Sequence, residues 1–275
     1  MTRRFVLIFI LSAISLLVIT SCKTKKSSEN AKTTSVIIET KFGNIKAILY
    51  NETPKHRDNF IKNVELGAYN GVIFHRVINS FMIQGGDPAT AANFKEDTTL
   101  LKQFDYSIDA EFIPNLIHKK GALAAARMPD NVNPKKQSSS TQFYIVQGKK
   151  FTIDDLQNLA VRKTENAKNT AINNLVLQKA NALIDEGKNP NISKIYAQLS
   201  DTLQQIKQHF IPYTFSDEQI NVYTTIGGTP HLDGDYTVFG EVIEGFDVID
   251  KIASVKTNAA DKPIEDVVMN IKIVK

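Results

Sequence analysis

The residues of this chain that could do chemistry gather between Phe74 and Asp87, a stretch that reads FHRVINSFMIQGGD. Arg76 carries a planar guanidinium that stays charged and presents its donors in a fixed fork. Such a donor can stabilise an atom that gains electron density in a transition state. Alternate side chains of a strand share a face, so Arg76 is expected on the same face as Phe74 and opposite His75. Taken alone, an arginine on a strand is most often solvated or ion-paired.

Other patterns in the chain favour no second chemistry. His75 lies beside Arg76, but a structural hydrogen bond is the preferred interpretation of it. The remaining histidines show neither HxxxH spacing nor nearby cysteines, so no metal is expected. Neither a GxxxxGKS loop nor a GxSxG elbow is present, which leaves nucleotide use and serine hydrolysis without support. The formal charge of +4 includes the basic residues near the N-terminus, so no nucleic-acid partner is expected.

Short strands and two helices must position this stretch. Two runs rich in β-branched residues, 36–40 and 45–50, surround Phe42-Gly43-Asn44 and predict a hairpin. A helix is predicted from Pro54, with Thr53 as its cap and an end at Gly67. Further strands are predicted at 121–124, 142–146, 236–242 and 267–274, with a helix at 246–253. Many short strands with few helices indicate a barrel or a sandwich.

Between Phe151 and about Tyr223 the apolar residues change to helical spacing. Two stripes result, one made of Ile192, Tyr196, Leu199, Leu203, Ile206 and Phe210, and the other of Ile172, Leu175, Val176, Leu183 and Ile184. Gly187 to Pro190 separates them, so an inserted helical hairpin is predicted at about 153–220. Such stripes more often pack against the protein itself. Contact of the insertion with clients or a partner protein is the alternative.

The N-terminus has the order of a secretion signal. Basic residues precede an apolar run from Phe5 to Ile19, which is shorter than the roughly 20 residues of a membrane-spanning helix. Ile19-Thr20-Ser21-Cys22 resembles a bacterial lipobox, and Cys22 is the single cysteine of the chain. We therefore expect a signal peptide over 1–21, lipidation of Cys22, a disordered tether over 22–34 and a domain over 35–275. The alternative is an ordinary signal core that contains a cysteine.

Five motifs of the folded part resemble those of the cyclophilins, in the same order and at the same spacing. They are FHRV and FMIQGGD within 74–87, GALAAAR from Gly121, TQFYI from Thr141 and HLDGDYTVFGEV from His231. The resemblance covers nearly all of 35–275 except the insertion, and Asn79 stands where the family usually has proline. It implies a mostly β fold, a closed antiparallel cyclophilin-like β-barrel capped by two helices, here with an inserted helical hairpin.

The resemblance also implies roles for individual residues. Arg76 would be the catalytic guanidinium, and Gln84 would bind the substrate backbone and orient that arginine. Ala126 and the main chain of Arg127 would form a ledge for the residue before proline. The proline pocket would be lined by Phe81, Met82, Tyr144 and Leu232, and Gln142, His231 and Tyr236 would be further substrate-binding residues. Tyr144 stands where many relatives have phenylalanine, and Met128 where a small residue is usual.

The implied activity is peptidyl-prolyl cis/trans isomerisation. Rotation about an Xaa-Pro bond faces a barrier of about 18–20 kcal/mol and makes no new bond. In the twisted form the prolyl nitrogen becomes an acceptor, so a fixed cationic donor favours the transition state. We expect action on proline-containing segments in the bacterial cell envelope, with no cofactor, and a lipid anchor facing the periplasm from the inner or outer membrane. The alternatives are a client-holding chaperone module and a structural lipoprotein.

Overall fold

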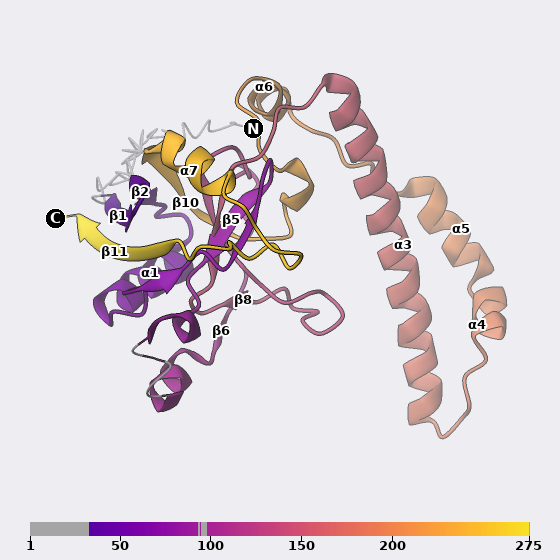
Figure 1. Ribbon diagram of the computed structural model, residues 1–275. Coiled ribbons are helices and arrows are strands. Elements are labelled where there is room, and N and C mark those ends of the chain that lie inside the picture. The colour runs from indigo at the N-terminus through magenta and orange to yellow at the C-terminus, as the bar shows by residue number, and fades with distance from the viewer. Residues whose placement is uncertain (1–32, 93, 95–97, 275) are drawn as a thin grey trace, which may run out of the picture. The chain divides into compact units, whose positions relative to one another are not determined.

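The computed structural model describes residues 33–92, 94 and 98–274, and its main element is a nine-stranded antiparallel sheet (Figure 1). The strands follow the order β3-β11-β1-β2-β10-β7-β9-β5-β4. Their bounds are β1 Thr34–Thr40, β2 Gly43–Leu49, β3 Val72–Ile73, β4 Arg76–Ile78, β5 Met82–Gly85, β7 Ala122–Ala125, β9 Phe143–Val146, β10 Val238–Glu244 and β11 Val268–Val274. The predicted hairpin over the first two runs is confirmed, since β1 pairs with β2.

The two edge strands of the curled sheet are β3 and β4. They are consecutive in the chain and are joined by Phe74-His75. Among the described residues no ladder pairs β3 with β4. Instead, the N–H of Phe74 donates to the carbonyl of Val267 at 2.9 Å, and that of Val77 to Asp261 at 2.8 Å. The predicted cyclophilin-like antiparallel fold is thus confirmed as a curled sheet, a half-barrel whose edges meet at this connection, with helices that make it a mixed α/β structure.

The connection between β3 and β4 also breaks the alternation of side chains. Phe74 is fully buried in the core of the barrel beside Val77, whereas the Arg76 side chain is 43% exposed. The prediction that Phe74 and Arg76 share a face is therefore wrong. Period-two counting requires one continuous strand, and β3 ends at Ile73 while β4 begins at Arg76.

Two helices cover the barrel core, as predicted. Helix α1, Pro54–Glu65, packs against β10 and β11, and its Phe60 ring lies 5.0 to 5.5 Å from the rings of Tyr69, Phe143 and Phe239. Helix α7, Phe246–Ala253, packs against β2, β4 and β5 and buries one face in the same core. Large aromatic groups in tilted and edge-on contact contribute strongly to such cores.

The first turn of α1 is capped from a distant loop. Thr53 stands at the N-cap position, as predicted, but its hydroxyl is buried without a hydrogen bond and does not cap the helix through its side chain. The Glu111 carboxylate instead accepts from the backbone N–H groups of Lys55 at 3.1 Å and His56 at 3.0 Å, as favoured at the positive end of a helix. It also accepts from Nδ1 of His56 at 2.7 Å, and burial lowers the pKa of this imidazole.

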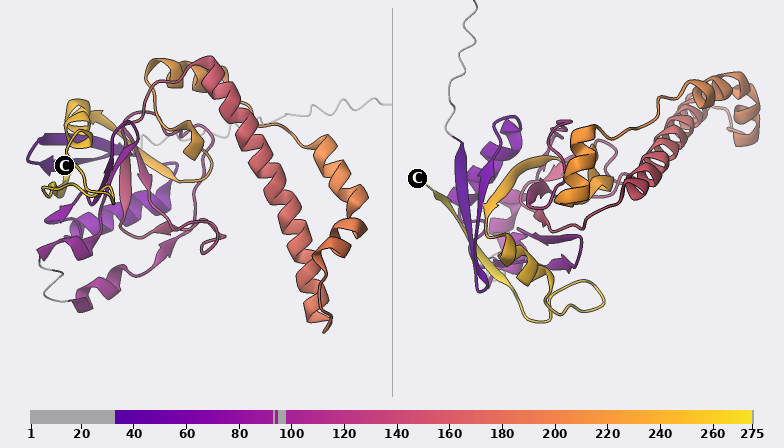
Figure 2. Two further views of the ribbon diagram at one scale, coloured as in Figure 1. Left: turned by 45° about the vertical axis from the view of Figure 1, so that its right-hand side comes forward. Right: turned by 90° about the horizontal axis from the view of Figure 1, so that it is seen from above.

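Four helices lie between β9 and β10, in place of the predicted hairpin of two. They are α3 Ile153–Asp185, α4 Ile192–Gln198, α5 Ser200–His209 and α6 Asp217–Thr225. Helices α4 and α5 both contact α3 (Figure 2), and α4 packs on it through a small cluster of Val176, Ala180 and Ile195. The hairpin arrangement is confirmed, but the predicted continuous stripe from Ile192 to Phe210 breaks at Leu199, between α4 and α5.

Small elements complete the described part of the chain. They are η1 Pro88–Thr90, η2 Thr98–Phe104, β6 Ser107–Ile108, β8 Ser138–Ser139 and η3 Pro230–Leu232. The predicted signal peptide, Cys22 and most of the predicted tether lie outside the described residues, and Thr34 already belongs to β1. Within residues 33–274 as described, no helix is long and apolar enough to span a membrane.

Candidate active site

A second apolar cluster lies on the face of the sheet opposite the barrel core. Successive side chains of β5 and β9 point to opposite faces of the sheet. Ile83 and Ile145 therefore enter the core, while Met82 and Tyr144 enter the second cluster. We call this second set the pocket cluster. Its buried members are Met82, Ala122, Ala124, Ala126, Tyr144, Val146 and Val238, and among the partly buried residues packed against it are Phe81, Leu232 and Tyr236. The structure therefore brings together the four residues predicted to line a proline pocket.

Arg76 and Gln84 lie beside this cluster on neighbouring strands. Arg76 of β4 is the cross-strand partner of Gln84 on β5, and Gln84 is in turn the partner of Tyr144 on β9. The three side chains therefore share one face of the sheet. The Nε of Arg76 lies 3.6 Å from the Oδ2 of Asp261, and the guanidinium remains partly exposed. This arrangement places a cationic donor beside the pocket cluster.

Gln84 belongs to a chain of side-chain amides. Its Nε2 donates to the Oε1 of Gln142 at 3.3 Å, and the Nε2 of Gln142 donates to Asp87 at 3.3 Å. Among the hydrogen bonds of the described residues, the Gln84 side chain meets Gln142 and not Arg76, to which it is related by strand register. The amide of Gln84 is thus fixed with its carbonyl oxygen available as an acceptor.

Of the two residues predicted to form the ledge, Ala126 has its main-chain groups hydrogen-bonded within the protein, whereas those of Arg127 have no partner among the described residues. The N–H of Ala126 donates to the carbonyl of Gln142 at 2.9 Å, and its own carbonyl accepts from Ser139 at 2.8 Å. For the main-chain N–H and C=O of Arg127, the described residues provide no partner. These two groups can therefore hydrogen-bond an extended peptide. A cavity of about 640 Å³ opens beside them, lined in part by Met128.

The side chain of Arg127 connects neighbouring segments of the protein through its polar and aromatic contacts. Its Nε donates to the carbonyl of Asp235 at 2.7 Å, its Nη1 lies 2.6 Å from Asp130, and its guanidinium lies 4.5 Å from the ring centre of Tyr236. A cation over an aromatic face is attracted by the ring quadrupole. The side chain therefore holds the Tyr236 wall of the site, while only the main chain faces the groove.

Aromatic side chains form the far wall of the pocket cluster. The ring of His231 lies 5.5 Å from that of Phe81, and the ring of Tyr236 stands edge-on to Tyr144 at 5.9 Å. Burial lowers the pKa of His231, which favours the neutral imidazole. Leu232 ends the 3₁₀ turn η3 in the same segment. The wall thus depends on how the segment 230–236 is held.

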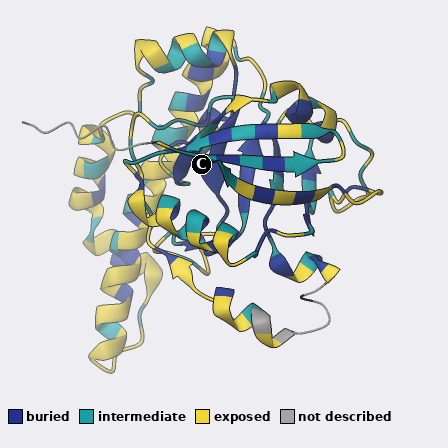
Figure 3. Ribbon diagram, turned by 90° about the vertical axis from the view of Figure 1, so that its left-hand side faces the viewer, coloured by how far each residue is buried: buried dark blue, intermediate teal, exposed yellow. Residues whose placement is uncertain are grey.

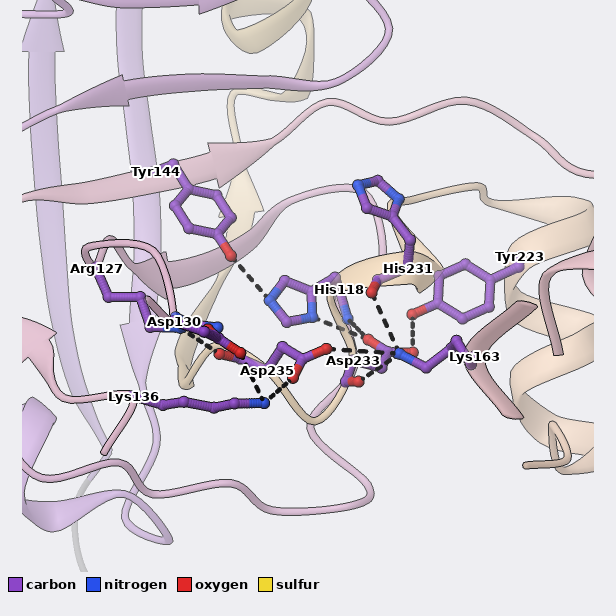
Figure 4. Close-up of polar contacts among 10 residues, drawn as sticks. All are labelled: His118, Arg127, Asp130, Lys136, Tyr144, Lys163, Tyr223, His231, Asp233 and Asp235. Carbon is purple, nitrogen blue, oxygen red and sulfur yellow. Dashed lines mark hydrogen bonds and ion pairs between the residues drawn. The ribbon is translucent and has the colours of Figure 1, made fainter. Parts of the chain in front are cut away.

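Four polar residues that the sequence did not single out hold this segment (Figure 4). Tyr144 Oη lies 3.0 Å from Nε2 of His118, whose Nδ1 and backbone N–H both lie 2.9 Å from Oδ1 of Asp233. Because a carboxylate only accepts, Nδ1 carries a proton, and in the neutral imidazole Nε2 then accepts from Tyr144. Tyr223 donates to Oδ2 of Asp233 at 2.6 Å, and Lys163 donates to the carbonyl of Asp233 at 2.8 Å.

The sequence offered only a weak signal for this network. Asp233 lies within the HLDG motif, but His118 is 115 residues away in the chain and belongs to none of the five motifs. Together with the pocket cluster, the Arg76 guanidinium and the free main chain of Arg127, the network completes one site. The fold is a curled half-barrel, and the site joins an apolar cluster on one face of its sheet to the partly exposed guanidinium of Arg76.

The chain belongs to the cyclophilin family, since the family model described as cyclophilin type peptidyl-prolyl cis-trans isomerase/CLD matches residues 35–179 and 200–273. A Staphylococcus haemolyticus protein assigned as a peptidyl-prolyl cis-trans isomerase is 31% identical over 216 residues, 78% of each chain. One from Staphylococcus aureus strain USA300 is 30% identical over 235 residues, 85% of this chain and 88% of that protein. The predicted family and enzyme class are therefore confirmed.

Solved structures agree on the fold. The crystal structure of a Cryptosporidium parvum cyclophilin type peptidyl-prolyl cis-trans isomerase covers 88% of this chain and 98% of its own, with a TM-score of 0.51 and 20% identity. A second crystal structure of that protein, determined in the presence of the dipeptide Ala-Pro, gives a TM-score of 0.50 at 20% identity. At this identity the likeness shows the shared fold.

Proposed function

We propose that this protein accelerates cis/trans isomerisation of Xaa-Pro bonds in extended protein segments of the bacterial envelope, with Arg76 as the catalytic donor. The observation that carries the proposal is the shared face of Arg76, Gln84 and Tyr144 beside the pocket cluster. A proline ring would lie against Met82, Tyr144 and the partly buried Phe81 and Leu232. Similarity to a protein crystallised in the presence of Ala-Pro supports a substrate of this class.

The mechanism follows from electrostatics and needs no proton transfer. As the Xaa-Pro bond twists, the prolyl nitrogen loses conjugation and becomes a hydrogen-bond acceptor. Asp261 engages the Nε of Arg76, which leaves the terminal guanidinium nitrogens as donors toward that nitrogen. Gln84 and the main chain of Arg127 would hold the flanking peptide in place. A donor that acts mainly on the twisted form lowers the barrier rather than merely binding substrate.

The direct test is the rate of exchange between the cis and trans forms of an Ala-Pro peptide, followed by NMR. Uncatalysed exchange takes tens to hundreds of seconds at 25 °C. The purified protein is expected to bring it into the sub-second range at micromolar enzyme. An unchanged exchange rate would overturn the proposed function.

The envelope location rests on the residues before the domain. An apolar run that leads into Ile19-Thr20-Ser21-Cys22 supports cleavage before Cys22 and acylation of its thiol. One acyl chain gives only marginal membrane binding, so firm anchoring needs more than one. When the full chain is produced in bacteria fed labelled palmitate, we expect it to take up the label, and the Cys22→Ser variant to take up none. Equal labelling of the two chains would contradict lipidation at Cys22.

A second candidate function, holding of unfolded clients, is favoured by the surface of the insertion. Most residues of helices α3, α4 and α5 are exposed (Figure 3). Leu177 and Ile184 are seven residues apart on α3, and Ile192 and Tyr196 are four apart on α4, so each pair shares a helix face. These four side chains are 41 to 56% exposed. We call them the arm surface, and we propose that it binds apolar client segments.

Replacing the four arm-surface residues with serine is expected to abolish protection of an unfolded client from aggregation, measured by light scattering. Turnover of a short Ala-Pro peptide should stay within about twofold of wild type, because the pocket cluster is untouched. The matched control replaces Ile226 and Ile264, which are exposed outside α3 to α5, with serine and should retain protection. Undiminished protection by the arm-surface variant would rule out this second function.

A further inference from the structure

We propose that the inserted helices position the proline pocket, with Tyr223 of α6 and Lys163 of α3 as the positioning residues. Both lie between β9 and β10, in the segment that interrupts the barrel. Neither touches the pocket cluster through its own polar atoms, and each acts through the segment 230–236. The consequence for turnover rests on the proposed isomerase function, whereas the coupling itself is a property of the fold.

Tyr223 begins a chain of hydrogen bonds that ends in the pocket. Its hydroxyl donates to Oδ2 of Asp233 at 2.6 Å, and the other carboxylate oxygen accepts from His118. His118 in turn accepts from the hydroxyl of Tyr144, whose ring belongs to the pocket cluster. All four residues are buried, and burial raises the pKa of both Tyr223 and Tyr144, so each hydroxyl keeps its proton. A fully satisfied buried network of this kind specifies one arrangement of its members.

Lys163 holds the same segment from a second direction. Its Nζ donates to the carbonyl of His231 at 3.2 Å and to that of Asp233 at 2.8 Å, and it lies 4.0 Å from a carboxylate oxygen of Asp235. Figure 4 shows the contacts with His231, Asp233 and Asp235 converging on the nitrogen of Lys163. Because the bonds are made to carbonyls, they fix the path of the backbone rather than a single side chain. Leu232 lies in the chain between His231 and Asp233, the two residues whose carbonyls accept from Lys163.

Backbone contacts keep α6 against the barrel at this point. The N–H of Gly228 donates to the carbonyl of Lys149 at 3.0 Å, and that of Thr229 donates to the carbonyl of His118 at 2.8 Å. A Cβ on Gly228 would lie 2.2 Å from the carbonyl oxygen of His118 and 2.8 Å from the ring of Tyr223. Only glycine allows this approach. The hydroxyl of Tyr223 is therefore presented to Asp233 by a rigid junction.

The test uses the full chain and two variants. Tyr223→Phe removes one hydroxyl and keeps the ring, and Lys163→Met removes the ammonium and keeps the stem. Controls on the same insertion are Thr225→Val, which removes an exposed hydroxyl of α6, and Lys179→Met. Two readouts are measured for each protein: the NMR resonances of the Leu232 methyl groups and the His118 imidazole, and kcat and KM for an Ala-Pro peptide.

Both variants are expected to shift these resonances and to raise KM about fivefold, the scale of one lost hydrogen bond. Because Arg76 is untouched, kcat should stay within about twofold. The controls should leave both readouts at wild-type values. The double variant Tyr223→Phe with Tyr144→Phe should raise KM by less than the product of the single effects, because both hydroxyls belong to one chain of bonds.

Two results would overturn the inference: resonances that stay at their wild-type positions in both variants, or shifted resonances with a wild-type KM in an active enzyme. If the wild-type protein shows no isomerase activity, the proposed function fails and the resonances alone decide the coupling. Tyr223→Phe is nearly isosteric and should fold, as far-ultraviolet circular dichroism can verify. The inference therefore remains testable even if Lys163→Met is unstable.

Discussion

Replacing Arg76 with alanine is expected to lower kcat/KM for an Ala-Pro peptide about 100- to 1,000-fold, the cost of removing a preorganised donor to a transition state. Most of the loss should appear in kcat, because the pocket cluster that binds the proline ring is unchanged. The fold should also be unchanged, since the Arg76 side chain is 43% exposed and its ion pair with Asp261 is a partly exposed one. NMR exchange measurements on wild type and variant check the prediction.

Two further variants sharpen this test. Arg76→Lys keeps the charge but loses the planar fork, so it should fall between wild type and Arg76→Ala. Arg162→Ala removes an exposed arginine of α3, outside the site, and should turn over peptide like wild type. Near wild-type turnover by a folded Arg76→Ala protein would remove Arg76 from the mechanism and leave pocket binding as the source of any catalysis.

Replacing Phe60 with alanine is expected to reduce the free energy of unfolding by about 3–5 kcal/mol. Phe60 is 2% exposed and contacts the rings of Tyr69, Phe143 and Phe239, which join α1 to the sheet. The loss would be a large part of a typical total of about 5–15 kcal/mol. Urea unfolding followed by circular dichroism measures it.

The control for Phe60 is a large apolar residue that is not buried. Leu177→Ala removes an exposed side chain of α3 and should change stability by less than about 0.5 kcal/mol. Comparable losses in the two variants would mean that the aromatic contacts of α1 do not dominate the core. An intact isomerase rate in folded Phe60→Ala protein would show in addition that the core and the pocket cluster are separable.

The sequence predicted the elements well where the pattern was local. The hairpin β1–β2, the start of α1 and the whole of α7 follow from β-branched runs, a proline at a helix start and helical spacing, all within a few residues. The predictions from sequence failed where tertiary contacts override a rule that depends on neighbouring residues alone. Phe74 leaves the expected face because the chain turns between β3 and β4. Thr53 occupies the N-cap position, but the side chain that accepts from the first turn of α1 is that of Glu111, 55 residues from His56.

The same distinction between local pattern and tertiary contact applies to the residues of the site. The pocket residues Phe81, Met82, Tyr144 and Leu232 could be placed because linked motifs carried them, and the structure does gather them in one cluster. The network of His118, Asp233, Tyr223 and Lys163 could not be predicted, because its members come from four separate segments. Buried polar pairing depends on three-dimensional approach, and neither hydropathy period nor motif spacing records it.

The length of α3 sets a scale for any client that uses both the arm surface and the pocket. With a rise of about 1.5 Å per residue, the 21 positions from Lys163 to Ile184 cover roughly 30 Å. An extended chain spans at most about 3.3–3.6 Å per residue. A polypeptide held at Ile184 while its proline lies beside Tyr144 therefore needs about ten unfolded residues in between. Compact loops and short peptides could reach the arm surface or the pocket cluster but not both, so the length of the helix would favour long unfolded segments.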